Sequence, residues 1–102
     1  MSGRISLFCD SGMSTSLLIN KMRDSAALKG KDYEIFAFPF SDFDVKAPGS
    51  DVCLLGPRTA YALPRLRQMY PDKKIAVIPA QIYGLMDGKG VLALAEKLLR
   101  EE

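Results

Sequence analysis

Short apolar runs alternate along the chain with longer segments in which apolar residues recur every three or four positions. Short apolar runs are typical of buried strands, and the longer spacing is typical of amphipathic helices. The pattern predicts strands over residues 4–8, 33–38, 51–55 and 74–78. It predicts helices over residues 13–28, 63–70 and 91–101, with a looser turn over 59–62 before the second helix.

Local signals support these boundaries. Ser11 or Ser14 can cap the start of the first helix, and Gly30 fits just past its end. Residues 40–50 and 81–90 are rich in residues that interrupt regular structure, so we predict loops there with at most a short helical turn.

Alternating strands and helices predict a single α/β domain over residues 1–102, with three layers. Helices should cover both faces of an open four-stranded parallel sheet with strand order 2-1-3-4, in which the first strand is central. Ligands of such sheets bind beyond the carboxyl ends of the strands, where the strand order reverses. Cys9 and the Gly56-Pro57-Arg58 turn should both lie at that edge.

Charge and composition exclude several classes of function. A net charge of +2 is too small to indicate nucleic-acid binding. The loose basic cluster of Arg65, Arg67, Lys73 and Lys74 has no interleaved aromatic residues, so we interpret it as a solvated surface.

The chain also lacks the usual signals for export, membrane insertion and metal binding. No apolar run approaches the ~20 residues that span a membrane, and the N-terminus has no signal-peptide core, so we expect a cytoplasmic protein. Cys9 and Cys53 form no metal-ligand spacing, and there is no histidine. The sequence therefore predicts no metal site and no cofactor.

Cys9 begins the segment with the strongest chemical signal. It ends an apolar strand and precedes a stretch of small and hydroxyl-bearing residues that opens a helix. Backbone N–H groups at such a junction converge on one point, and the helix N-terminus favours negative charge there, including a thiolate or a phosphoryl group. A buried, inert cysteine is the alternative, and local features alone leave the two open.

Low-molecular-weight cysteine phosphatases use a similar strand–loop–helix, with arginine six positions after the cysteine. Thr15 occupies that position here, and no Asp-Pro dipeptide is present to supply a general acid. Without the guanidinium, a phosphorylated thiol would be hydrolysed poorly, which suits a phosphoryl carrier. A small phosphatase or arsenate reductase is one alternative, and a regulatory binding module is another.

The chain resembles the IIB components of the bacterial phosphoenolpyruvate-dependent sugar phosphotransferase system (PTS), lactose/cellobiose type. The resemblance covers nearly the whole chain. The residues that carry it are Leu7-Phe8-Cys9 with Ser11-Gly12-Met13-Ser14-Thr15-Ser16-Leu17-Leu18, Asp51-Val52 with Leu54-Leu55-Gly56-Pro57, Ala60-Tyr61, Leu63-Pro64, Tyr83-Gly84, and Asp87-Gly88 with Gly90-Val91-Leu92.

This resemblance implies a role for Cys9 in sugar uptake. The thiol would take a phosphoryl group from a phosphohistidine of the IIA component. It would pass the group to a sugar of the cellobiose, chitobiose or lactose class, held by the membrane component IIC. The implied phosphate-binding residues are Asp10, Ser11, Gly12, Met13, Ser14, Thr15 and Ser16. We expect a monomer, since a shuttle needs its site free.

Two residues depart from the family pattern. Asp10 stands where a small neutral residue is expected, and we predict that its carboxylate points to solvent or accepts a hydrogen bond within the loop. Arg58 stands where a neutral amide is expected. It is either an ordinary surface charge or a group that offsets Asp10 and steers an anionic partner.

Several apolar residues can surround Cys9 or simply pack in the core. They are Met13, Leu17, Pro57, Tyr83 and Met86. We interpret Leu17 as core, whereas docking and core roles are equally open for Met13. Cys53 lies within an apolar strand, and we interpret it as an inert buried thiol.

Overall fold

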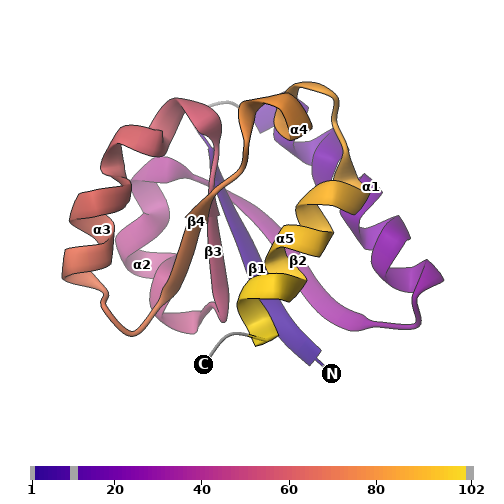
Figure 1. Ribbon diagram of the computed structural model, residues 1–102, viewed down its shortest axis with the longest axis horizontal. Coiled ribbons are helices and arrows are strands. Elements are labelled where there is room, and N and C mark those ends of the chain that lie inside the picture. Colours follow the sequence, from indigo (N-terminus) through magenta and orange to yellow (C-terminus); the bar gives the residue numbers. More distant parts are fainter. Residues whose placement is uncertain (1, 10–11, 101–102) are drawn as a thin grey trace.

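A four-stranded parallel sheet with strand order β2-β1-β3-β4 forms the centre of the fold, as the sequence predicts (Figure 1). The structure is a computed structural model and describes residues 2–9 and 12–100. The strands are β1 (Ser2–Cys9), β2 (Asp32–Pro39), β3 (Val52–Leu55) and β4 (Lys74–Val77). β1 pairs with β2 on one side and with β3 on the other, so it is central.

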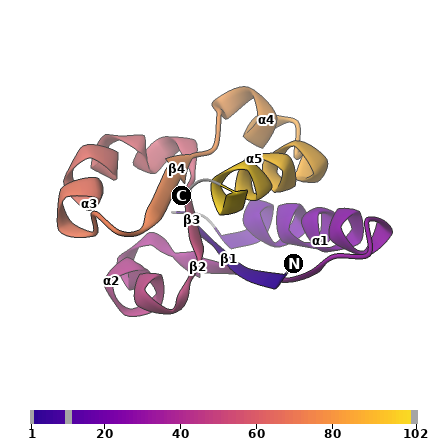
Figure 2. The same ribbon diagram turned by 60° about the horizontal axis from the view of Figure 1, so that its bottom comes forward.

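Helices cover both faces of the sheet and complete three layers (Figure 2). The longer helices α1 (Gly12–Leu28) and α5 (Gly88–Arg100) cover one face, with the short α4 (Ala80–Gly84) beside α5. The other face carries α2 (Phe43–Lys46) and α3 (Leu63–Met69), together with the 3₁₀ segments η1 (Phe40–Asp42), η2 (Ala47–Gly49) and η3 (Pro57–Ala62). Among the described residues, no helix is both long and apolar enough to cross a membrane.

The end of α1 confirms the role predicted for Gly30. Gly30 has a φ of 67°, and its N–H donates to the Ala27 carbonyl at 3.0 Å. The N–H of Lys31 donates to the Ala26 carbonyl at 2.9 Å. These two bonds form a Schellman motif, which requires a left-handed residue at the position that glycine occupies.

The start of α5 differs from the prediction. The helix begins at Gly88 and not at residue 91. A Cβ on Gly88 would lie 2.6 Å from the Cβ of Lys21, so this glycine permits close contact between α5 and α1. Asp87 caps the helix, since its carboxylate accepts the N–H of Gly90 at 2.9 Å. Gly88, one of the glycines that suggested a loop, therefore serves helix packing.

The segment over residues 40–49 also contains more helix than we predicted. It consists of η1, α2 and η2 in succession, where the sequence predicts a loop with one turn at most. Phe43 and Ala47 are buried, so the segment folds because it covers the sheet. Its elements are too short for a helical pattern to be seen in the sequence.

Two apolar clusters fill the spaces between the layers. The first lies under α1 and α5 and contains Ile5, Leu7, Leu18, Ile19, Met22, Ala26, Ile35, Val52, Leu54, Ile78, Val91, Leu92 and Ala95. The second lies under the short helices and contains Phe8, Phe43, Ala47, Cys53, Leu55, Ala62, Leu66 and Ile75. Successive residues of β1 and β3 enter opposite clusters, because side chains alternate across a sheet.

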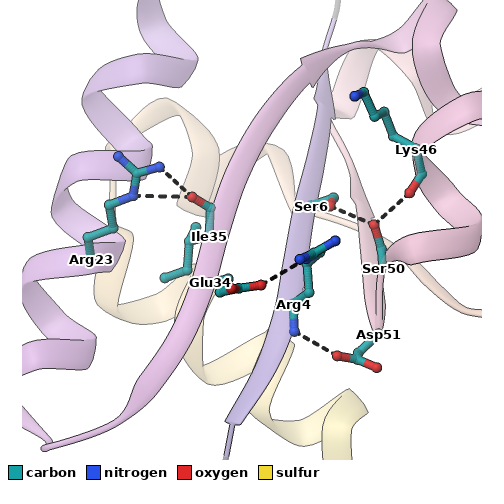
Figure 3. Close-up of polar contacts among 8 residues, drawn as sticks. All are labelled: Arg4, Ser6, Arg23, Glu34, Ile35, Lys46, Ser50 and Asp51. Carbon is teal, nitrogen blue, oxygen red and sulfur yellow. Dashed lines mark hydrogen bonds and ion pairs between the residues drawn. The ribbon is translucent and has the colours of Figure 1, made fainter.

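On each edge strand, one backbone carbonyl accepts hydrogen bonds from an arginine of a neighbouring helix. Arg23 of α1 donates two hydrogen bonds to the Ile35 carbonyl on β2, at 3.1 Å from Nε and 2.6 Å from Nη2 (Figure 3). Arg67 of α3 donates to the Ile75 carbonyl on β4 at 3.2 Å. A carbonyl bonded in this way is no longer available to another strand, so the arginines protect the sheet edges.

Polar contacts join the first half of β1 to the segment before β3. The N–H of Arg4 donates to the Asp51 carboxylate at 2.7 Å (Figure 3). The buried hydroxyls of Ser6 and Ser50 lie 2.6 Å apart, and that of Ser50 also donates to the Lys46 carbonyl at 3.0 Å. Because a hydroxyl has one proton, Ser6 is the donor to Ser50. The pair is thus satisfied inside the core.

A buried carboxylate joins α5 to the end of α1 and the start of β2. Glu96 is 8% exposed and accepts hydrogen bonds from Lys29 Nζ at 2.7 Å and from the Tyr33 hydroxyl at 2.9 Å. The bond from Lys29 lowers the pKa of Glu96, burial opposes this effect, and the bond from Tyr33 lowers it further. Burial and the bond to Glu96 raise the pKa of Tyr33. The contribution of this cluster to the free energy of unfolding therefore depends on pH.

We expect Glu96→Gln to lower the free energy of unfolding by about 1–2 kcal/mol near neutral pH, because the Lys29 ammonium loses its charged partner. The folded state lowers the Glu96 pKa below its ordinary 4.5, so the carboxylate contributes its full stability above that value. The contribution is lost as the pH falls through the lower folded-state pKa. Urea unfolding of both proteins between about pH 3 and 8 measures this dependence.

Glu34→Gln is the matched control. Glu34 pairs with Arg4 at 2.9 Å, but both side chains are about half exposed, at 56% and 48%. Its replacement should change the free energy of unfolding by at most about 0.5 kcal/mol. An effect of Glu96→Gln that persists unchanged at the acid end of the series would contradict the assignment.

Candidate functional site

Cys9 lies where β1 ends and α1 is about to begin. It is the last residue of β1, and α1 begins at Gly12, so only residues 10 and 11 connect the two elements. In Figure 1 the end of β1 and the start of α1 both lie at the top of the molecule, the edge where the strands end. The predicted strand and helix on either side of this segment are therefore present, and the helix begins one residue earlier than predicted.

The N-terminus of α1 lies on the other side of this junction from Cys9. The first four N–H groups of a helix have no intrahelical partner, and in α1 these belong to residues 12–15. A 17-residue helix also places positive potential at this end, and its first turn contains no acidic residue. The local backbone thus favours an anion beside Cys9.

The end of β3 reaches Cys9 from the neighbouring strand. The N–H of Gly56 donates to the Phe8 carbonyl at 3.0 Å, which continues the pairing of β1 and β3 by one step. A Cβ on Gly56 would lie 3.1 Å from the Cys9 Sγ. The Cys9 residue is only 6% exposed, so its sulfur lies in a sheltered position.

The predicted phosphate-binding residues are described to different extents. Asp10 and Ser11 lie outside the described residues. Residues 12–15 form the first turn of α1 in their backbone, while their side chains, including those of Met13, Ser14 and Thr15, lie outside the description. Ser16 follows in the same helix and is exposed.

The apolar residues predicted near Cys9 fall into different environments. Leu17 is 51% exposed, so its interpretation as a core residue was wrong. Leu18, Met22 and Ala26 take the inner face of α1, and Leu17 lies too far around the helix to join them. Tyr83 is half-buried and packs against the core under α1 and α5.

Met86 and the turn after β3 complete this group. Met86 packs against the same core and lines a groove beside Lys21 and Asp24 of α1. Pro57 is half-buried and Arg58 is exposed, both at the start of η3. Arg58 is thus at the carboxyl edge of the sheet, where the sequence placed it.

Cys53 lies inside the protein, in the second apolar cluster. It is fully buried in β3, and burial raises its pKa to about 11, although Lys73 and Ser50 partly offset this effect. The interpretation of Cys53 as a buried thiol is confirmed. A thiol this weakly ionised is a poor nucleophile near neutral pH.

Sequence reasoning missed the contact between Gly56 and Cys9. It placed the Gly56-Pro57-Arg58 turn at the same edge of the sheet as Cys9 but predicted no contact between Gly56 and the thiol. The available signal was its position, since a glycine at the end of the strand beside β1 lies next to whatever ends β1.

Comparison with known proteins identifies the family. The model of the family described as "PTS system, Lactose/Cellobiose specific IIB subunit" matches residues 4–94. The chain belongs to this family. It is therefore a sugar-specific IIB component of lactose/cellobiose type, and such components act as phosphotransferases in sugar transport.

Relatives of known name agree with this assignment. The galactose-specific EIIB component of Lactococcus lactis subsp. cremoris and the cellobiose-specific EIIB component of Lactococcus lactis subsp. lactis are each 44% identical, covering 93% of this chain and 94% of theirs. The oligo-beta-mannoside-specific EIIB component of Bacillus subtilis is 34% identical, covering 94% of this chain and 95% of its own.

Solved structures confirm the fold. The cellobiose-specific IIB component of Borrelia burgdorferi is 32% identical and superposes with a TM-score of 0.80 over 97% of this chain and 93% of that one. The lactose-specific IIB domain of Streptococcus pneumoniae has a TM-score of 0.83 over 98% of this chain and 100% of that one. That domain is only 11% identical, so its likeness concerns the fold alone.

Cys53→Ala should leave phosphoryl acceptance unchanged within about two-fold, because the Cys53 thiol is buried on the face opposite α1 and stays protonated. Intact mass of the variant after incubation with a phosphorylated donor tests this expectation. Loss of phosphoryl uptake by a variant that keeps its circular dichroism spectrum would show that Cys53 takes part.

Proposed function

We propose that Cys9 accepts a phosphoryl group from a phosphohistidine of the IIA component and transfers it to a sugar bound by the membrane component IIC. The observation that carries the proposal is the position of Cys9, at the end of β1 and opposite the N-terminus of α1. A thiolate and the phosphoryl group attached to it both gain from the unpaired N–H groups of that helix.

The first transfer needs only the thiolate and the donor. The Cys9 sulfur attacks phosphorus, an S–P bond forms, and the P–N bond to the donor imidazole breaks. The imidazole leaves with the electron pair of that bond and takes up a proton, which returns it to the neutral form. The amide groups of residues 10–16, which we propose as the phosphate-binding segment, stabilise the equatorial oxygens during this step.

The second transfer reverses the roles at sulfur. A sugar hydroxyl oxygen attacks phosphorus, an O–P bond forms, and the S–P bond breaks to return the thiolate. The hydroxyl proton passes to a base, which we assign to the partner that holds the sugar. The chain described here supplies a good leaving group, since a thiolate favoured by amide dipoles departs readily.

Between the two transfers the phosphoryl group has to survive in water. Cys9 is 6% exposed, so the surrounding protein limits the access of water to an S–P bond at its sulfur. Thr15 stands where hydrolytic enzymes with a similar loop have arginine, so the loop over residues 10–16 itself supplies no guanidinium to stabilise attack by water. Both features favour a carrier over a phosphatase.

We propose that both partners dock at the carboxyl edge of the sheet. Two large exposed apolar side chains follow these strand ends closely in the chain, Leu17 in the second turn of α1 and Tyr61 in η3, at 51% and 77%. Apolar groups around a reactive centre suit a transient interface. Arg58 at the same edge would steer the anionic phosphohistidine site toward Cys9.

The sugar is proposed to belong to the class that includes cellobiose, chitobiose and lactose. The named relatives are specific for galactose, cellobiose and oligo-beta-mannosides. We also propose that residues 1–102 act as a single domain, as a cytoplasmic monomer.

Incubation with phosphoenolpyruvate, the two general components of the system and a matching IIA should add one phosphoryl group to the native chain. Cys9→Ser should gain no phosphoryl group, because a serine hydroxyl is not ionised at neutral pH. Intact mass spectrometry at neutral pH measures both.

Two results would overturn the proposal. One is uptake by Cys9→Ser equal to that of the native chain. The other is turnover of an aryl phosphate by the native chain at a rate typical of enzymes, about 1 per second or faster, which would assign a phosphatase.

A further inference from the structure

Gly56 lies directly against the thiol of Cys9. A Cβ built on its backbone would be 3.1 Å from the Cys9 Sγ and 3.6 Å from the Cys9 Cβ. A separation of 3.6 Å is ordinary van der Waals contact, whereas 3.1 Å is tight for carbon and sulfur. An added methyl group would therefore press mainly on the sulfur atom.

The backbone of Gly56 does not itself require glycine. Its φ of −65° and ψ of 157° lie in the extended region that every residue adopts. Alanine at such a position is compatible with the backbone and reduces the freedom of the unfolded chain. The reason for glycine here is thus space beside Cys9, in contrast to Gly30, whose φ is 67°.

The backbone of Gly56 is also held on both sides. Its N–H donates to the Phe8 carbonyl at 3.0 Å. Its carbonyl accepts the N–H of Thr59 at 3.0 Å and the Thr59 hydroxyl at 2.9 Å, and Thr59 is buried. A side chain at residue 56 could not move away from Cys9 without breaking these bonds, so the thiol would have to move.

We propose that Gly56 is a positioning residue for Cys9: the absence of a side chain on the clamped end of β3 keeps the thiol at the point where β1 meets α1. This inference rests on the proposed function of Cys9 for its consequence in phosphoryl transfer. The close approach of Gly56 to the Cys9 sulfur does not depend on that function. Thr59 supports the same arrangement by fixing the Gly56 carbonyl.

A double-mutant cycle tests the geometry. Gly56→Ala should lower the thermal midpoint by about 4–8 °C in the native background, because a tightly packed site resists the methyl group. In the Cys9→Ala background only ordinary contacts remain, at 3.6 Å to the Cβ and 3.8 Å to the Cα of residue 9, and the same substitution should change the midpoint by less than about 2 °C. The cycle requires no partner protein and no phosphoryl transfer.

Gly49→Ala is the matched control. Gly49 also lies outside the left-handed region, and the nearest atom to its added Cβ is an arginine nitrogen at 3.6 Å. Its thermal midpoint should stay within about 2 °C of the native chain in both backgrounds.

Thiol chemistry tests the consequence. Displacement of Sγ from the helix N-terminus should slow alkylation of Cys9 by iodoacetamide about five-fold at neutral pH. Peptide mass spectrometry separates Cys9 from Cys53. Phosphoryl uptake from phosphorylated IIA should slow by about ten-fold or more, since transfer depends on accurate placement of the nucleophile.

The outcomes separate this inference from the proposed function. Equal effects of Gly56→Ala in both backgrounds, including failure of both to fold, would overturn the contact. An unchanged rate of Cys9 alkylation in Gly56→Ala would overturn the positioning role. A native chain that takes up no phosphoryl group would overturn the proposed function, while the stability cycle would still decide the contact.

Discussion

The hydrogen bond from the Gly56 N–H to the Phe8 carbonyl joins the ends of β1 and β3, and the arrangement of the site depends on it. The two strands are adjacent in the sheet but separated by more than forty residues in the chain. Their joined ends form the point where the strand order reverses. Such points bring strand ends and helix N-termini together at one edge, so the edge is suited to bind anions. Cys9, at the end of the central strand, thereby lies at this edge.

The opposite half of the molecule supplies stability. Glu96, Lys29 and Tyr33 form a buried polar cluster that ties α5 to the end of α1 and to β2. Ser6 and Ser50 are bonded to one another inside the protein, and Asp51 binds the Arg4 N–H (Figure 3). None of these contacts lies at the carboxyl edge. Residues at the carboxyl edge are thus not needed for these stabilising contacts.

Much of this arrangement follows from local sequence. The four strands, the end of α1 at Gly30 and the start of α3 at Leu63 agree with their predicted positions, because strong apolar runs, a left-handed glycine and a first-turn proline act locally. The short helices over 40–49 and the early start of α5 were not predicted. Their residues fold as they do because Phe43 covers the sheet and Gly88 lets α5 approach Lys21. Both causes are contacts with distant segments.

The sequence by itself determined the strand that ends at Cys9, the helix that follows it, the family and the burial of Cys53. These properties depend on residue types at short spacing, which the order of the chain contains directly. Only the tertiary structure decided that Leu17 faces outward and that Gly56 touches the thiol. The rotation of α1 against the sheet sets the direction of Leu17. The register between β1 and β3 sets the contact of Gly56 with the thiol. Both are fixed when the whole core packs together, so no local pattern could show them.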